Sequence, residues 1–181
     1  MELSSTGETN GPKIIMKNYF NTKRLKLGSL TYRNAGFILE LLNTPGWLKF
    51  IGDRNVKDLT DARNYIKKIR GLTNVKYRVV YTKDKTTPLG IITFIKRDYL
   101  DHHDIGFAFL PDHTRSGYGF EATTAVLNYL HKDAGINTML ATTVPDNFAS
   151  IALLGKLGYQ FDKQITTDGI SLLVYKLQFG L

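Results

Sequence analysis

The chain has 181 residues, 43% hydrophobic and 22% charged, which fits one soluble globular domain with a full-sized core. It has no cysteine, which excludes a disulfide scaffold, a thiolate zinc site and a cysteine nucleophile. No apolar run approaches the roughly 20 residues that a membrane helix needs, so we expect a cytoplasmic protein without a membrane span. The polar start lacks the basic and apolar parts of a signal peptide. We predict a disordered tail over 1–12 and a single domain over 13–181.

The net charge of +8 is unevenly distributed along the chain. Residues 1–90 carry 17 Lys/Arg and 7 Asp/Glu, whereas residues 91–181 carry 7 and 9. A basic protein suggests nucleic-acid binding. Here the basic residues are scattered over predicted helices and strands, and no zinc finger or basic zipper accompanies them. We interpret this charge as solvated surface and do not expect nucleic acid as the main partner.

The predicted elements form an α+β fold. In chain order they are a strand over 23–27, a helix over 31–42 that Pro45 and Gly46 end, a helix from a Thr60 cap to Arg70, a hairpin of strands over 77–82 and 89–95, a strand over 104–110, a helix over 117–131, a strand over 138–143, a helix capped by Asp146 or Asn147 that ends at Leu157, and strands over 159–164 and 170–177. This order predicts a central, mostly antiparallel mixed sheet with one β-α-β crossover and flanking helices.

A glycine-containing loop, Arg115-Ser116-Gly117-Tyr118-Gly119, lies between a predicted strand and a predicted helix. Glycines let the backbone approach a ligand closely, and the first turn of a helix presents unpaired N–H groups that suit phosphate. A P-loop needs Gly-Lys-Ser/Thr, which Phe120 and Glu121 rule out. A dinucleotide fingerprint fits the glycine spacing but belongs in a first βαβ unit. A plain turn with two glycines stays open from the loop alone.

The context of this loop resembles a known family. The run Asp104-Ile105-Gly106-Phe107-Ala108-Phe109-Leu110-Pro111, followed by the loop and Ala122, resembles the GNAT acetyltransferases, and among them the Rim-type protein N-acetyltransferases. The stretch from Asn147-Phe148-Ala149-Ser150 to Leu157-Gly158-Tyr159 is similar to that subfamily's Asn-x-x-Ser helix with its Leu-Gly-aromatic end. Residues 22–52 resemble its first strand and helix pair, so the likeness extends over residues 22–177.

The resemblance implies acetyl-CoA as the co-substrate and assigns parts of it to particular residues. Main-chain groups of Phe109 and Leu110 would pair with the pantetheine amides, N–H groups from Arg115 to Gly119 would hold the pyrophosphate, and Asn147 would contact the pantetheine. The expected cofactor-binding residues are Phe109, Leu110, Arg115, Ser116, Gly117, Tyr118, Gly119 and Asn147. The family loop opens with Gln or Arg three places before its first glycine, a position that Thr114 holds here.

Acyl transfer to an amine also needs a base for the amine proton, an oxyanion donor and a proton source for the thiolate. Ser150, which the resemblance places near the sulfur beside Asn147, is the candidate donor to the thiolate; a first-turn serine bonded to backbone is the alternative. Asp104 is the candidate base, with Asp101, His102 and His103 beside it, although all four could be solvent-facing residues at a strand edge. We expect no metal site, because adjacent strand residues point to opposite faces.

These observations predict an acetyl-CoA-dependent N-acetyltransferase. It would act on a primary amine, such as a protein N-terminus or a small amine, by direct attack in a ternary complex, as a monomer or homodimer and without a metal. The acidic balance of residues 91–181 favours a cationic acceptor. A CoA-binding GNAT-like sensor or interaction module without catalysis is the alternative, and a basic nucleic-acid-binding protein is a third.

Overall fold

The computed structural model of the protein describes residues 16–84 and 86–180. The predicted tail over 1–12 lies outside these residues. The elements run in the order β1 (Tyr19–Asn21), β2 (Leu25–Ser29), a 3-10 turn (Tyr32–Asn34), α1 (Ala35–Leu42), α2 (Pro45–Phe50), α3 (Leu59–Gly71), β3 (Val75–Thr82), β4 (Pro88–Ile95), β5 (Asp104–Phe109), a second 3-10 turn (Pro111–His113), α4 (Tyr118–Lys132), β6 (Thr138–Thr143), α5 (Phe148–Lys156), β7 (Gln160–Thr167) and β8 (Ile170–Gln178).

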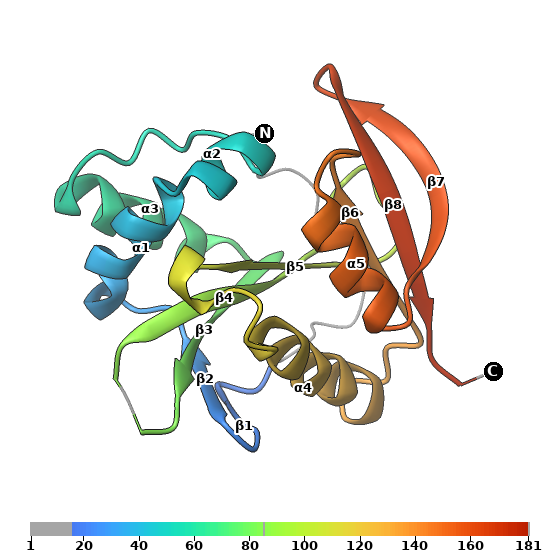
Figure 1. Ribbon diagram of the computed structural model, residues 1–181, viewed down its shortest axis with the longest axis horizontal. Helices are drawn as coiled ribbons and strands as arrows, with labels where there is room; N and C mark the ends of the chain where they lie inside the picture. Colours follow the sequence, from blue (N-terminus) through green and yellow to red (C-terminus); the bar gives the residue numbers. More distant parts are fainter. Residues whose placement is uncertain (1–15, 85, 181) are drawn as a thin grey trace.

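All eight strands belong to one sheet, in the order β1-β2-β3-β4-β5-β6-β8-β7. Every neighbouring pair is antiparallel except β5 and β6, which are parallel and joined through α4 (Figure 1). The predicted mixed sheet with one β-α-β crossover is therefore confirmed.

Two apolar layers cover the sheet, because successive strand residues point to opposite faces. Val79 and Ile91 pack with the helices α1 to α3 on one face, whereas Val80 and Ile92 pack with α4 and α5 on the other. The chain thus has one helical group on each side of the strands (Figure 1).

Local chemistry explains two departures from the predicted elements. Asp58, not Thr60, caps α3, since its carboxylate accepts the N–H groups of Thr60 (2.7 Å) and Asp61 (2.8 Å). Pro45 begins a helix instead of only ending one, because proline suits the first helical position and Thr44 caps it by accepting the Trp47 N–H. That extra helix, α2, completes the helix pair implied by the family resemblance.

No helix in the described ranges is both long enough and apolar enough to cross a membrane.

Candidate active site

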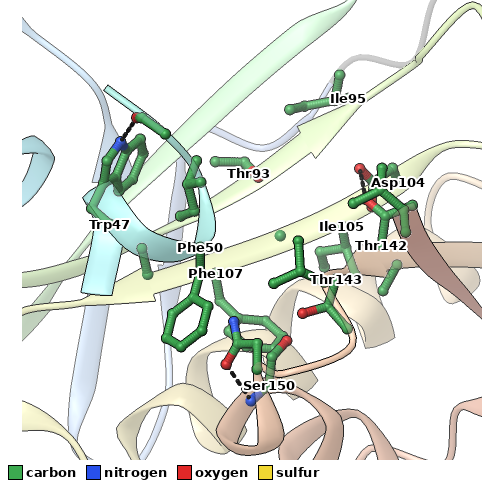
Figure 2. Close-up of a pocket in the computed structure, with 18 of the residues that line it drawn as sticks. Trp47, Phe50, Thr93, Ile95, Asp104, Ile105, Phe107, Thr142, Thr143 and Ser150 are labelled. Atoms are coloured by element: carbon green, nitrogen blue, oxygen red, sulfur yellow. Dashed lines mark hydrogen bonds between the residues drawn. The ribbon is translucent and has the colours of Figure 1, made fainter. Parts of the chain in front are cut away.

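A cleft opens where β5 and β6 separate. These strands share one paired position, Asp104 with Leu140, beside a hydrogen bond from the Leu140 N–H to the His103 carbonyl (2.9 Å). Past that position lies a cavity of about 420 Å³, a size that suits a small ligand. Figure 2 shows its walls: Trp47 and Phe50 from α2 on one side, Asp104 on the other, and Ser150 from α5 below.

The main chain of β5 offers hydrogen-bonding groups toward this opening. Leu110 is not among the residues that do so, because its N–H donates to the Leu89 carbonyl (2.9 Å) and its carbonyl accepts from the His113 N–H (3.0 Å). Antiparallel pairing alternates, so Phe109 and Phe107 turn their N–H and C=O groups away from β4. The Leu110 groups that were predicted to contact the pantetheine thus already have partners within the chain, and Phe107 joins Phe109 as a candidate with open groups.

The loop before α4 presents a run of unpaired N–H groups. The first main-chain bond of the helix joins the Glu121 N–H to the Gly117 carbonyl (3.0 Å), so across 115–120 the N–H groups have no acceptor within the described chain. Arg115 (φ 58°) and Gly117 (φ 77°) both adopt the left-handed conformation that turns the chain into the helix. Such a run, at the positive end of a 15-residue helix, can hold a phosphate.

Gly119 brings this loop against the end of β5. A Cβ atom at Gly119 would lie 3.2 Å from the Leu153 side chain and 3.4 Å from the Phe109 ring. The absence of a side chain therefore allows α4 to begin beside Phe109. The loop over 115–120 thus adjoins the open main chain of β5.

Arg24, the residue before β2, holds the loop in place through contacts with Ser116 and the first turn of α4. Its guanidinium bonds to the Glu121 carboxylate (2.6 Å) and to the Ser116 carbonyl (3.0 Å), and it lies over the Tyr118 ring at 4.7 Å from the centroid. Glu121 also accepts the Arg24 N–H (2.8 Å) and the Thr22 hydroxyl (2.5 Å). Sequence reasoning missed this pair, because the two residues are 97 positions apart.

The positive side chain beside the loop is therefore Arg24. Arg115 is exposed, and the Thr114 hydroxyl donates to the Pro111 carbonyl (2.8 Å), which closes the turn after β5. Thr114 thus serves the local turn at the place where the family carries Gln or Arg.

Asn147 and Ser150 stand at the start of α5, and both line the cavity. The Asn147 side-chain oxygen accepts the Ser150 N–H (3.2 Å), which makes Asn147 the cap of the helix (Figure 2). Capping alone accounts for the Asn side chain and the Ser backbone, but not for the Ser150 hydroxyl. That hydroxyl makes no hydrogen bond to any residue that the structure describes, and it lies at the cavity wall.

Asp104 lies at the closed end of the cleft and is 2% exposed. One carboxylate oxygen, Oδ2, pairs with the Arg97 guanidinium and accepts the Thr142 hydroxyl (3.4 Å), whereas Oδ1 is buried without a partner among the described residues. Burial raises the pKa of Asp104, although Arg97 and Thr142 oppose the rise. A buried carboxyl with one oxygen to spare suits a proton acceptor that works through a water molecule.

Asp101, His102 and His103, which precede Asp104 in the chain, do not line the cavity. His103 stacks on Phe94 (ring centroids 4.5 Å apart), and burial, with Lys96 and His102 nearby, lowers its pKa to about 4. Asp101 is exposed and lies 3.7 Å from the Lys163 amine. Across the described ranges no group of three or more His, Cys, Asp or Glu side chains is arranged to hold a metal ion.

The charges at the cavity are mainly positive. Lys49, Arg54 and Arg97 line it, against the single carboxylate of Asp104. The surplus acidic residues of the second half, such as Asp98 and Asp133, are exposed elsewhere on the surface. Most of the acidity that suggested a cationic acceptor therefore lies outside the cleft, and the preference for such an acceptor stays a prediction.

Comparison with known proteins gives the family. The Acetyltransferase (GNAT) domain matches residues 24–160, well over half of the chain. The chain belongs to the GNAT acetyltransferases. The sequence is 28% identical over 142 residues to the uncharacterized N-acetyltransferase YnaD of Bacillus subtilis (strain 168), a match that covers 77% of this chain and 81% of that protein.

Solved GNAT structures share the fold. An acetyltransferase (GNAT family) from Bacillus anthracis superposes with a TM-score of 0.75 at 23% identity, covering 88% of this chain and 98% of that one. Mycobacterium smegmatis RimJ, solved in complex with CoA-disulfide, gives a TM-score of 0.73 at 16% identity, covering 86% and 82%. The resemblance to the GNAT family is therefore confirmed, and the fold is shared with a Rim-type protein.

Proposed function

We propose that this GNAT acetyltransferase transfers the acetyl group of acetyl-CoA to a primary amine, a small amine or a protein N-terminus, by direct attack in a ternary complex. The observation that carries the proposal is that the loop over 115–120, the open side of β5 and the cavity adjoin one another in that order. The unpaired N–H groups of 115–120 adjoin the Phe109 ring through Gly119, and the open side of β5 leads from there to the cavity that holds Ser150 and Asp104.

The residues fit the parts of acetyl-CoA. The loop over 115–120 would bind the pyrophosphate through main-chain N–H groups, with Arg24 holding the loop in shape. Main-chain groups of Phe107 and Phe109 would pair with the pantetheine amides. Asn147, fixed as the α5 cap, would contact the pantetheine arm.

The chemistry needs only proton transfers besides the attack itself. The amine nitrogen attacks the thioester carbonyl carbon, the C–S bond breaks, and CoA leaves as a thiolate. Asp104 would take the amine proton through a water, and the Ser150 hydroxyl would donate a hydrogen bond or proton to the departing sulfur. Since the chain has no cysteine, direct attack is the route that these side chains support over a cysteine-bound acyl intermediate.

A CoA-binding module without catalysis would need the loop but not the two cavity groups. The presence of Ser150 and Asp104 on the cavity wall favours catalysis. The deciding experiment is to measure thiol release from acetyl-CoA with a pool of amines, amino acids and peptides. We expect release that requires both acetyl-CoA and an amine. Tight acetyl-CoA binding with no thiol release in the presence of any acceptor would support the CoA-binding module instead. No acetyl-CoA binding at all would overturn both the transferase and the binding module.

A further inference from the structure

We propose that the acceptor is an amine that also carries a carboxylate, and that Arg54 binds this carboxylate. The inference rests on the proposed function and names its substrate class. It starts from the position of Arg54 in the segment between α2 and α3, where its half-buried side chain lines the cavity. The Arg54 guanidinium donates a long hydrogen bond, 3.4 Å, to the Gly52 carbonyl.

Arg54 differs from the other two cations at the cavity. Lys49 pairs with Asp146 at the rim (3.1 Å), and Arg97 pairs with Asp104. No carboxylate of the described residues lies within ion-pair distance of Arg54. The walls therefore carry one positive charge without a counter-charge, in a place where a partly desolvated guanidinium favours an anion.

Two tyrosines beside Arg54 add a donor to the same place. The hydroxyls of Tyr65 and Tyr77 are 3.0 Å apart, Tyr77 and Arg54 both line the cavity, and the Arg54 charge opposes the rise that burial causes in the pKa of both hydroxyls. A hydroxyl pair uses one of its two hydrogens internally and leaves the other for an acceptor. Arg54 cannot accept this second hydrogen, because a guanidinium has only donors. An anionic oxygen can accept from the tyrosine pair and from Arg54 at once.

The occupant is a small carboxylate compound for two reasons. The phosphates of acetyl-CoA are assigned to the loop over 115–120, which is not part of the cavity wall, and a phosphate ester with a charge near −2 would need a second unpaired cation. Apolar side chains such as Trp47, Phe50 and Ile95 form much of the remaining wall, and they suit the hydrocarbon part of an amino acid or of a short peptide.

The test compares acceptors with and without a carboxylate at the same position. Leucine, phenylalanine and the dipeptide leucylglycine are each assayed beside the corresponding C-terminal amide, with acetyl-CoA and thiol detection. We expect at least one acid to have a kcat/KM about tenfold or more above that of its amide, since a charge-assisted bidentate bond is lost in the amide. Arg54→Gln should remove that preference, and Arg54→Lys should restore part of it.

A matched control separates a direct contact from the general field of the protein. Lys57→Gln removes one positive charge three positions away, on an exposed residue that does not line the cavity. It should leave the ratio of acid to amide unchanged. Amides that turn over as well as acids, or a ratio that Arg54→Gln does not change, would overturn the assignment of Arg54.

Binding of the acetylated compounds keeps this test apart from that of the proposed function. N-acetyl-leucine and N-acetyl-leucinamide are titrated calorimetrically into the CoA-loaded protein and its Arg54→Gln variant. If no amine turns over, acid-selective binding that requires Arg54 still supports the carboxylate site, whereas the proposed transfer fails. If neither compound binds, or both bind alike, the carboxylate site fails, whatever the assay of turnover shows.

Discussion

The loop over 115–120 and the proposed acceptor end of the cleft offer different kinds of groups to a ligand. The loop offers main-chain N–H groups from six consecutive residues, and its shape depends on the backbone conformation of Gly117. The acceptor end offers side chains that come from separate segments, such as Trp47 from α2, Arg54 from the following loop and Asp104 from β5. A backbone site tolerates changes of side chain but not of conformation, whereas a side-chain site responds to single substitutions. Substitutions on each side test this difference.

The largest effect is expected at the left-handed glycine of the loop. Gly117→Val forces a β-branched residue to φ 77° and places its Cβ atom 3.2 Å from the Arg24 guanidinium. The loop must change shape, and losing two charge-assisted bonds to the pyrophosphate weakens acetyl-CoA binding about 100-fold or more. Titration calorimetry measures the Kd.

The control for this variant is Gly135→Val. Gly135 has a similar conformation, φ 68°, with open space around it, at the far end of α4. It carries a similar backbone strain, on the order of 1–2 kcal/mol, without touching the loop. Acetyl-CoA binding weakened equally by both variants would show that strain alone, not the loop, is responsible.

On the cleft side, Asp104→Asn should lower kcat by about 100-fold, because the amide cannot accept the amine proton. Acetyl-CoA affinity should change little. Arg97→Gln separates two roles for Asp104, since it keeps the carboxylate but removes the guanidinium that opposes the rise of its pKa. If Asp104 is the base, the lowered kcat of Arg97→Gln should recover as the pH is raised; a kcat that stays as low as that of Asp104→Asn at every pH would mean that Asp104 only positions Arg97.

Ser150→Ala is expected to lower turnover about 30-fold, since a hydrogen-bond donor to the departing sulfur is lost. The α5 cap should persist, because Asn147 bonds to the Ser150 backbone N–H and not to its side chain. Single-turnover kinetics with a good acceptor, together with the Kd of acetyl-CoA, measure the two effects separately. A matching loss in affinity and in turnover would mean that Ser150 contributes to binding alone.

Arg24→Gln tests how far the loop depends on support from a side chain. It removes the ion pair with Glu121 and the bond to the Ser116 carbonyl, but no N–H group of the loop. A partly exposed pair contributes up to about 1 kcal/mol, so acetyl-CoA affinity should fall about fivefold. An effect as large as that of Gly117→Val would show that the side chain holds the phosphate directly.

The smallest effect concerns pH and the start of β5. The pKa of His103 is about 4 in the folded chain and about 6.5 when unfolded, so the unfolded chain binds the proton more readily. The associated stability is present above pH 6.5 and is lost as the pH falls through about 4. It amounts to on the order of 1 kcal/mol, since the ring is partly exposed.

His103→Phe keeps the stacking on Phe94 and removes the titration. Urea unfolding between pH 4 and 8 should therefore show a smaller acid loss of stability in the variant than in the unchanged chain. Identical pH profiles would mean that His103 is not held neutral by its surroundings.

The sequence was informative where function depends on neighbouring residues. The β5 strand, the left-handed Gly117 and the α4 start are contiguous, so the spacing of Pro111 and the glycines is enough to indicate them. The Asn147 cap followed for the same reason, since a cap and its helix are adjacent in the chain. The sequence could not show that the Leu110 N–H already bonds to Leu89, because the direction of a main-chain group depends on strand register, which needs the partner strand.

The sequence alone indicates most of the order of elements and the mixed sheet, which follow from periodicity, and its local motifs resemble the family; the short strand β1 and the helix α2 were not predicted. Folding brings together residues that are far apart in the chain: Arg24 meets Glu121 at the loop, and Arg54 lies beside Tyr77 in the cleft. These pairs arise from the packing of separate segments, which no local pattern indicates. For the same reason only the tertiary fold shows that Lys49, Arg54 and Arg97 line the cavity, because net charge along a segment does not tell which side chains fold toward it.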